Sequence, residues 1–387
     1  NMDSCMFLTN EQKDMNVILE VVCIFLIVLS NTIMAQQNPK NLEIHWNTDT
    51  NKRIAPLEEF TALLKPDEIP PIDDPEFWNA GRATMNYFSH EPVIAVAMGG
   101  EAKAYPLSIL TYHEIVNDYV GGTPVSVTYC PLCNAAIVFD RRVSVDGDQR
   151  LLDFGVSGML RNSDLVMWDR QTESWWQQFT GEALVGKLAG TRLTYLSSMI
   201  ISLEEFLTSY PDGKILSTHT GHDMAYGTNP YTGYDDLGNT RPRLYSGSVD
   251  ARLPAMERVI DIHAKGKYKI YPLTLIQQKG VINDRFEDRD IVIFYTSKTV
   301  SVLDERQISE SRKIGSVTVF SRKVDDQVLT FRKEPEGFVD EQTGSAWSIT
   351  GKCFSGELNG NNLRPIVHGN HFAFAWFAFH PDSEVYQ

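Results

Sequence analysis

The feature of the sequence that most constrains the fold is an internal duplication. Stretches near residues 105–212 recur near residues 271–382 at an almost constant offset. Short insertions and deletions in loops explain the small drift of this offset along the chain. The clearest matches are Tyr105-Pro106-Leu107 with Tyr271-Pro272-Leu273, and Asp169, Gln171, Thr172, Ser174 and Trp176 with Asp340, Gln342, Thr343, Ser345 and Trp347. The chain is therefore expected to contain two diverged copies of one structural unit.

The duplication divides the chain into predicted segments. We assign residues 91–216 to copy one and residues 257–387 to copy two. Residues 217–256 are rich in Gly, Asn, Pro and Tyr and have no helical or strand periodicity, which predicts a long ordered connector. Residues 36–90 contain several prolines and are expected to form an amino-terminal arm that wraps the body.

The fold class follows from the local patterns. Short β-branched and aromatic runs dominate both copies, and helical patterns are few. Residues 203–209 are predicted to form a helix because Ser202 and Glu205 make a capping-box pattern at its start. A second helix is predicted over residues 107–117. We expect a mainly β fold with a few short helices (α+β), in which the two copies pack as one pseudo-symmetric body.

An apolar run over residues 17–29 dominates the amino-terminal segment. It is shorter than a bilayer span and has the length of a signal-peptide core, and Ala35 is a small residue suited to cleavage. Residues 1–35 are therefore predicted to be a signal peptide, with Met15 as the true start of translation. The alternative is an uncleaved anchor, which would be the only link to a membrane. Either form predicts an extracytoplasmic body, periplasmic or secreted.

The charge balance and the cysteine count restrict the chemistry. The chain has 35 Lys and Arg against 50 Asp and Glu, a net charge of −15, without a run of basic residues. Such a chain is not expected to bind nucleic acid or an anionic lipid surface, since both require clustered positive charge. Three cysteines, Cys130, Cys133 and Cys353, lie beyond the signal segment, and three do not make a disulfide framework.

The duplication also permits an internal comparison. Residues present in both copies are expected to serve the fold, whereas reactive residues present in one copy are candidates for function. Copy one alone carries the Cys-x-x-Cys pair Cys130 and Cys133. It also carries His113 and Glu114 where copy two has a Lys-Gly pair. These four residues are the predicted catalytic group.

Two thiols in a predicted turn between strands have three possible roles. They can form a disulfide that opens and closes during redox chemistry, remain an inert staple, or bind a metal through both sulfur atoms. In the redox role, His113 would stabilise the attacking thiolate and the other thiol would resolve the mixed disulfide. In the metal role, Cys130, Cys133 and His113 would be ligands of copper or zinc. The sequence leaves these roles open, including a site without any cofactor.

A second group of residues unique to copy one follows at 155–164. It contains Ser157, but Met159 stands where the last glycine of a serine-hydrolase elbow would be, so a hydrolase is the weakest reading. Polar residues of this stretch are expected to line a pocket together with nearby aromatic residues, although a solvated loop and a packed core would explain them equally well. The predicted pocket-lining residues are Tyr129, Ser157, Arg161, Asn162, Asp164, Trp175 and Trp176.

The remaining histidines and the third thiol are assigned structural roles. The spacing of His219 and His222, and of His368 and His371, allows chelation only from a turn or helix, so surface or hydrogen-bonded histidines are expected. Cys353 stands opposite Ala183 in copy one, which favours a small buried residue with an inert thiol. A role as a resolving thiol or third ligand is the alternative.

Several motifs of copy one resemble those of domain-of-unknown-function family 3179. The similarity extends over most of residues 90–386. The motifs are Tyr112-His113-Glu114-Ile115-Val116-Asn117-Asp118, Gly121-Gly122, Val127-Thr128-Tyr129-Cys130-Pro131-Leu132-Cys133, Phe139-Asp140-Arg141, Phe154-Gly155-Val156-Ser157-Gly158, Asn162-Ser163-Asp164-Leu165-Val166-Met167-Trp168-Asp169-Arg170 and Gly181-Glu182-Ala183. The resemblance implies an exported bacterial-type protein with two copies, and marks His113, Cys130 and Cys133 as motif positions. It implies no particular activity.

Two function classes compete at this point. The first is an extracytoplasmic protein whose Cys-x-x-Cys and histidine site carries out thiol redox chemistry with a partner protein, or binds a soft metal, copper or zinc. The second is a non-catalytic protein that binds a small molecule. In that case Cys130 and Cys133 would form a structural disulfide, and aromatic residues would line a ligand cleft: Trp168, Trp175, Trp176, Tyr231 and Tyr234.

Overall fold

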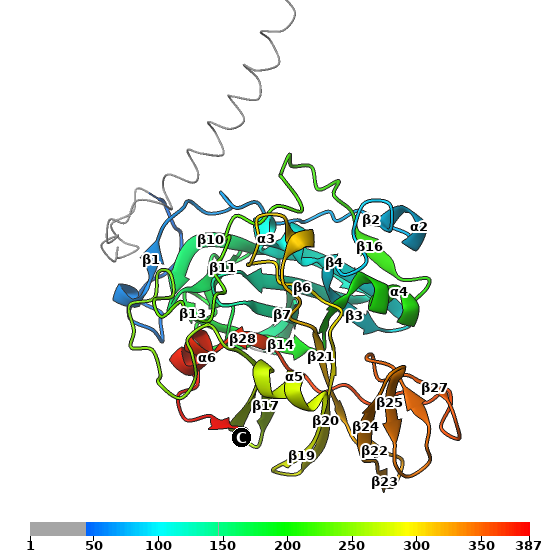
Figure 1. Ribbon diagram of the computed structural model, residues 1–387. Coiled ribbons are helices and arrows are strands. Elements are labelled where there is room, and N and C mark those ends of the chain that lie inside the picture. Colours follow the sequence, from blue (N-terminus) through cyan, green and yellow to red (C-terminus); the bar gives the residue numbers. More distant parts are fainter. Residues whose placement is uncertain (1–43, 146) are drawn as a thin grey trace, which may run out of the picture. The chain divides into compact units, whose positions relative to one another are not determined.

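The computed structural model describes residues 44–145 and 147–387 (Figure 1). The predicted signal peptide, residues 1–35, and the predicted start at Met15 lie outside the described residues. Strands dominate the described chain and the helices are short, which confirms the predicted mainly β fold class. No helix of the described ranges is both long and apolar enough to cross a membrane.

The amino-terminal arm is mostly irregular and pairs with copy one through short strands. Strand β1 joins β10, and β2 joins β16, both in antiparallel fashion. The elements of the arm are η2 (Leu57–Glu59), β1 (Thr61–Ala62), β2 (Phe77–Trp78) and α2 (Ala80–Ala83).

Copy one begins with two antiparallel strands, a helix of about two turns and a meander of three more strands. Its elements are β3 (Pro92–Met98), β4 (Glu101–Pro106), α3 (Leu107–His113), β5 (Ile115–Val120), β6 (Thr123–Cys130), β7 (Ala135–Asp140), β8 (Arg142–Val145), β9 (Asp148–Leu151), β10 (Phe154–Arg161), β11 (Asp164–Asp169), β12 (Trp175–Gln177), β13 (Glu182–Val185), β14 (Thr194–Leu196), β15 (Met199–Ser202), α4 (Leu203–Ser209) and β16 (Lys214–Leu216).

Copy two starts with the same order of elements, since β17, β18, α5, β19, β20 and β21 follow one another as β3, β4, α3, β5, β6 and β7 do. Its elements are β17 (Arg258–Ala264), β18 (Lys267–Pro272), α5 (Leu273–Lys279), β19 (Val281–Phe286), β20 (Arg289–Thr296), η3 (Ile308–Glu310), β21 (Ser316–Ser321), β22 (Lys323–Val324), β23 (Gln327–Val328), β24 (Phe331–Glu334), β25 (Gly337–Asp340), β26 (Ala346–Trp347), β27 (Cys353–Ser355), β28 (Asn370–Phe372), α6 (Ala373–Phe379) and β29 (Glu384–Val385).

Equivalent residues of the two copies make the same hydrogen bonds. The indole Nε1 of Trp176 donates to Asp169 Oδ2 at 2.9 Å, and Trp347 Nε1 donates to Asp340 Oδ2 at 2.9 Å. In both copies the carboxylate also accepts bonds from the threonine three residues later. All four residues of these two pairs are fully buried. Burial of an indole N–H requires a partner, so these shared pairs hold the fold.

The two copies are joined through one sheet and through contacts that the carboxy-terminal segment of each copy makes with the other copy. An eight-stranded sheet has the order β19-β20-β21-β15-β3-β4-β16-β2, in which β15 of copy one pairs with β21 of copy two at Ile200 and Val317. On the other side, β28 of copy two lies beside β7 of copy one, and α6 packs against β28 and β17 (Figure 1). One buried apolar cluster contains residues of both copies. The pseudo-symmetry of this packing stays a prediction.

The helix predicted over residues 203–209 is confirmed as α4 (Leu203–Ser209). Its capping box is complete, because Ser202 Oγ accepts from the Glu205 amide at 3.2 Å and the Ser202 amide donates to Glu205 Oε2 at 3.0 Å. This reciprocal pair satisfies two backbone N–H groups that a helix start otherwise leaves open.

The helix predicted over residues 107–117 is wrong in its length. Helix α3 ends at His113, Glu114 turns into the left-handed region with φ 58°, and β5 begins at Ile115. Residues 115 and 116 are β-branched and pair with β6, so strand pairing outweighs the weak helical pattern there.

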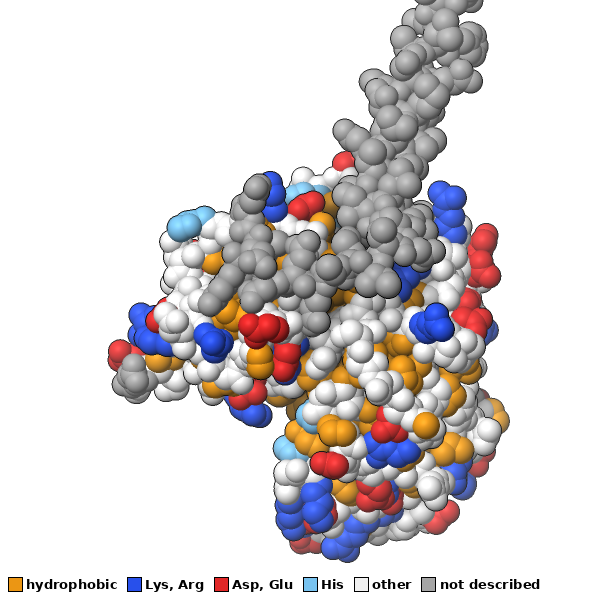
Figure 2. Space-filling model, turned by 90° about the vertical axis from the view of Figure 1, so that its left-hand side faces the viewer, with side chains coloured by type: hydrophobic (Ala, Val, Ile, Leu, Met, Phe, Trp, Pro, Cys, Tyr) orange, Lys and Arg blue, Asp and Glu red, His pale blue; other side chains and the backbone are white. Residues whose placement is uncertain are grey.

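The surface mixes charges of both signs. On the face that Figure 2 shows, basic and acidic side chains are interspersed among apolar and neutral ones. Several of them form exposed ion pairs, such as Lys267 with Glu287 at 2.6 Å and Lys298 with Glu204 at 3.0 Å. Exposed pairs of this kind add little stability.

Candidate metal centre

The Cys-x-x-Cys segment forms the turn between two strands of the sheet β14-β7-β6-β5. Strand β6 ends at Cys130, β7 begins at Ala135, and these two residues pair across the turn. Asn134 closes the turn with φ 50°, and its amide donates to Pro131 O at 3.3 Å. Asparagine tolerates this left-handed conformation better than most residues, which explains why the turn can be so short.

A carboxylate joins the two thiols. The sulfur atoms of Cys130 and Cys133 and one carboxylate oxygen of Asp164 all lie within 4.8 Å of one another. The exposed fractions of these residues are 2%, 0% and 0%, and both cysteines are free thiols. The donor atoms of a metal centre must converge in this way, so the three residues form the candidate site.

Asp164 is placed by a tight hairpin turn. Strands β10 and β11 form a hairpin in which Arg161 pairs with Asp164. The two residues between them, Asn162 and Ser163, have φ of 53° and 67°. Two consecutive positive φ values define the type I′ turn that two-residue hairpins favour. Ser163 O also lies 3.8 Å from Cys130 Sγ, so the same turn contacts one of the thiols.

The carboxylate of Asp164 is held from one side only. Its Oδ2 accepts from Gln177 Nε2 at 2.6 Å and from the Phe179 amide at 2.9 Å. Arg161 Nη1 in turn donates to Gln177 Oε1 at 3.2 Å. The other oxygen, Oδ1, is buried and accepts no hydrogen bond from an N–H or O–H group of the described residues, and the thiols of Cys130 and Cys133 are the remaining donors beside the carboxylate. Thiols are weak donors, so this buried acceptor favours a stronger partner.

Burial favours the protonated forms of the three groups. It raises the pKa of Asp164 to about 7, against the opposing effect of the bonds from Gln177, Phe179 and the neighbouring thiols. Burial is also the main reason that the pKa of Cys130 is raised and that of Cys133 lies well above its ordinary value. Low-dielectric surroundings disfavour every one of these anions, so each group holds its proton more strongly unless a cation compensates the charge.

His113, predicted as the third ligand, is not part of this group. Its Nδ1 lies 2.6 Å from Pro70 O and its Nε2 lies 2.5 Å from the Tyr226 hydroxyl. A carbonyl only accepts, so Nδ1 carries the proton and Nε2 accepts from Tyr226. Burial lowers the pKa of His113 to about 4, which keeps the ring neutral. Because both of its ring nitrogen atoms are hydrogen-bonded, His113 links the amino-terminal arm and the connector to α3.

The connector covers the thiols. Tyr234 donates to Leu132 O at 2.9 Å, and Ser163 Oγ donates to Arg243 O at 2.7 Å. The connector is itself fixed to copy two, because Asp235 accepts from Arg258 at 2.7 Å in a fully buried ion pair. The site is therefore enclosed by residues far away in the sequence.

The other predicted pocket-lining residues are mainly structural. Ser157 is buried in the bulge of β10, where its Oγ donates to Val166 O at 2.5 Å. Trp175 and Trp176 are buried among apolar side chains, and do not face an open cleft. Tyr129 is also buried, and its hydroxyl donates to Asn134 Oδ1 at 3.3 Å.

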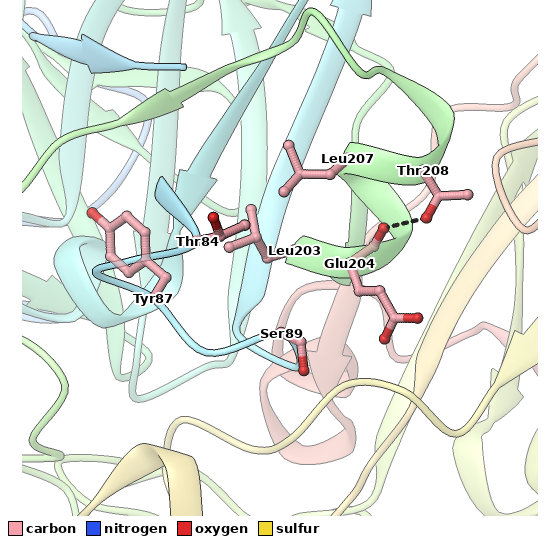
Figure 3. Close-up of a pocket in the computed structure, with 7 residues that line it drawn as sticks. All are labelled: Thr84, Tyr87, Ser89, Leu203, Glu204, Leu207 and Thr208. Carbon is pink, nitrogen blue, oxygen red and sulfur yellow. Dashed lines mark hydrogen bonds between the residues drawn. The ribbon is translucent and has the colours of Figure 1, made fainter. Parts of the chain in front are cut away.

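The surface hollows lie elsewhere. The pocket in Figure 3 has a volume of about 360 Å³ and lies against α4, where Thr208 Oγ1 donates to Glu204 O. A second hollow of about 460 Å³ lies beside His380. Neither is lined by Cys130, Cys133 or Asp164. We consider the buried cluster the better candidate because only it brings together groups that need a ligand. Cys353 is buried in β27, and its Sγ lies 3.3 Å from Ser355 O.

Fold and site together define a class: a mainly β protein that encloses two thiols and a carboxylate beneath a long connector. The family model described as "Protein of unknown function (DUF3179)" matches residues 66–383, so the chain belongs to this family. This confirms the resemblance found from the motifs. Comparison with curated proteins and with solved structures gave no match.

Sequence reasoning placed Asp164 in the right region but not among the ligands. The available signal was its presence in copy one only. At the offset that relates Asp169 to Asp340, copy two has Pro335 in place of Asp164. The same internal comparison that selected Cys130 and Cys133 therefore also selects Asp164.

Proposed function

We propose that this protein binds a divalent cation of the zinc type through Cys130, Cys133 and Asp164. The observation that carries the proposal is the convergence of three ligand atoms within 4.8 Å in a buried site. Thiolate sulfur and carboxylate oxygen are both zinc ligands, at distances of roughly 2.3 Å and 2.0–2.2 Å. Modest side-chain adjustments would bring the three atoms to one ion.

The charge of the site supports a cation. Two thiols and a carboxyl group release up to three protons when they become ligands, and a divalent cation offsets two of the resulting negative charges. Without a cation, burial holds the pKa values of all three groups above their ordinary values. Oδ1 of Asp164 accepts no hydrogen bond from an N–H or O–H group of the described residues, and a cation would satisfy it.

Zinc suits this donor set better than copper. Soft ligand sets of thiolates and thioethers select copper(I), whereas carboxylate oxygen is a harder ligand. A mixed set of two sulfur atoms and one oxygen matches the borderline character of zinc. With three ligands from the protein, one tetrahedral position remains open, as in catalytic zinc sites.

The redox role has weaker support. Thiol–disulfide exchange requires an accessible thiolate, and exposed sulfur favours it. Both thiols are buried beneath the connector, and burial raises their pKa values. A cation-binding role needs no protein partner at the sulfur atoms. The extracytoplasmic location proposed from residues 17–29 fits a protein that acquires its ion outside the cytoplasm.

Metal analysis tests the proposal. The full chain is purified without oxygen and without added metal, and its metal content and reduced thiols are measured together. We expect about one equivalent of zinc per chain, with Cys130 and Cys133 reduced. Cys130→Ser and Asp164→Asn should lose the ion, whereas Cys353→Ser, a buried thiol outside the site, should retain it.

The opposing results are distinct. A protein that takes up no zinc even after incubation with excess ion contradicts the proposal. One equivalent of copper contradicts the choice of zinc. A metal-free Cys130–Cys133 disulfide would instead favour the redox role.

A further inference from the structure

Glu114 occupies a backbone position where glycine is favoured and where copy two has glycine. It follows the last residue of α3 with φ 58°, and its amide donates to Leu110 O at 2.8 Å. In copy two the equivalent residue is Gly280, with φ 67° and an amide that donates to Ile276 O at 2.8 Å. The helix end is the same in both copies, and glycine is the usual residue there.

A glutamate at this position is unfavourable in two ways. The left-handed conformation is strained for a residue with a Cβ atom. The side chain is also buried, with 8% exposed, and no hydrogen bond to its carboxyl group is found among the described residues. Burial first, and then the charge of Asp164, raise the pKa of Glu114 to about 8.

The position of Glu114 connects it to the thiol site. Its carbonyl oxygen accepts from the amide of Tyr129 at 2.8 Å, so its backbone is fixed next to the residue that precedes Cys130. The side chain is near enough to Cys130 and Asp164 for their charges to act on one another. It is not among the three ligands whose atoms converge. A second carboxylate on the ion would also add another buried negative charge.

We propose that Glu114 is a positioning residue of the cation site, whose carboxyl group hydrogen-bonds the water or other small polar molecule that fills the open fourth coordination position. This inference rests on the proposed function. Loss of an outer-shell group that hydrogen-bonds to a metal ligand commonly lowers metal affinity by about 10-fold to 100-fold. Retention of a strained, buried acid is understandable if the bound ion needs it, because functional sites are where such strain persists.

The test replaces Glu114 by the residue that copy two already uses. In Glu114→Gly the strain and the buried acid both disappear, so the midpoint of thermal unfolding of the metal-free protein should rise by about 2 °C. The affinity for Zn²⁺, measured by competition with a chromogenic chelator, should fall by about 10-fold or more. With Co²⁺ as the probe, the thiolate-to-metal absorption should persist while the d–d bands shift, because only the fourth position changes.

Two variants serve as controls. Gly280→Glu introduces the same strain into copy two, where the added Cβ meets only the Lys333 side chain at 3.1 Å. It should lower the unfolding midpoint and leave the affinity for Zn²⁺ unchanged. Glu114→Gln keeps the side-chain volume and the strain, so it should weaken Zn²⁺ binding without the gain in stability.

The outcomes separate this inference from the proposed function. If the unaltered protein binds neither Zn²⁺ nor Co²⁺, the proposed function fails and this inference fails with it. If the unaltered protein binds both ions, and Glu114→Gly and Glu114→Gln match it in affinity and in the Co²⁺ spectrum, only the role of Glu114 is overturned. A lower unfolding midpoint in Glu114→Gly would equally overturn it, since Glu114 would then serve the fold.

Discussion

The backbone amide of Phe372 donates a hydrogen bond of 2.9 Å to the carbonyl oxygen of Cys133. Phe372 belongs to β28 of copy two, and Cys133 to the thiol turn of copy one. The neighbouring Asn370 accepts from Asn134 Nδ2 through both its carbonyl oxygen, at 3.2 Å, and its Oδ1, at 3.1 Å. A strand near the carboxy-terminal end of copy two therefore supports the turn that carries the thiols of copy one.

A first prediction concerns this contact between the copies. Asn370→Ala removes one acceptor for the buried Asn134 amide and should lower the free energy of unfolding by about 1–2 kcal/mol. It should also weaken Zn²⁺ binding several-fold, because the turn loses a support. Urea unfolding and chelator competition measure the two effects. Asn362→Ala, at an exposed residue, is the matched control and should change neither. Unaltered affinity in Asn370→Ala would show that the turn holds its geometry alone.

A second prediction concerns His113. Because both of its ring nitrogen atoms are engaged with Pro70 and Tyr226, His113→Ala should reduce stability by about 1–3 kcal/mol and change Zn²⁺ affinity by less than about threefold. The same competition assay, with Cys130→Ser as the reference for a lost ligand, decides it. A loss of binding as large as that of Cys130→Ser would restore His113 as a ligand.

A third prediction concerns pH. Asp164 has an ordinary pKa of 3.8 that burial raises to about 7, and Glu114 one of 4.5 raised to about 8. Between the ordinary and the raised pKa of each group, the folded chain keeps a proton that the unfolded chain has lost. The stability of the metal-free protein should therefore fall as pH rises from about 4 to 8. Unfolding by urea across this range measures the slope. Asp164→Asn should flatten it.

The metal-loaded protein should behave in the opposite way. Thiols and carboxyl groups must lose their protons to bind an ion, so Zn²⁺ affinity should increase with pH over the same range. Isothermal titration in buffers of different ionisation enthalpy would count the protons released. An affinity that does not depend on pH would argue against ligands with raised pKa values.

A fourth prediction concerns the residues that both copies share. Asp340→Ala leaves the buried indole of Trp347 without its acceptor and should cost about 2–3 kcal/mol. The equivalent change in copy one, Asp169→Ala, should cost a similar amount, since it does the same to Trp176. Both variants should retain one equivalent of zinc when folded. Loss of the ion in Asp169→Ala alone would place Asp169 in the site.

In copy two the residues at the equivalent positions make structural hydrogen bonds. Thr296 and Thr299 stand where copy one has Cys130 and Cys133. The Glu205 carboxylate accepts hydrogen bonds from Thr296 and, at 2.5 Å, from Ser316. The hydroxyl groups of Thr299 and Ser316 are hydrogen-bonded to each other. Glu205 comes from α4 of copy one. Hydroxyl groups thus satisfy a buried carboxylate at this position, and no ion is required.

The sequence by itself determined the features that depend on local pattern. Short runs of β-branched and aromatic residues predicted a mainly β fold, and the pair Ser202 and Glu205 predicted the start of α4, because both signals act over a few residues. The internal duplication separated residues common to both copies from those unique to one. That comparison selected Cys130 and Cys133, which the structure places in one turn.

Only the tertiary structure decided which residues meet. His113 ends α3 and Cys130 ends β6, with β5 between these two elements, and the ring of His113 turns to the arm and connector instead. Asp164 reaches the thiols because a type I′ turn and the register of β10 with β11 set its direction. Register moves whole side chains between faces, and no local pattern specifies it. The residues that enclose the site come from the connector and from copy two. They are far from the thiols along the chain, so local sequence patterns do not indicate that they meet.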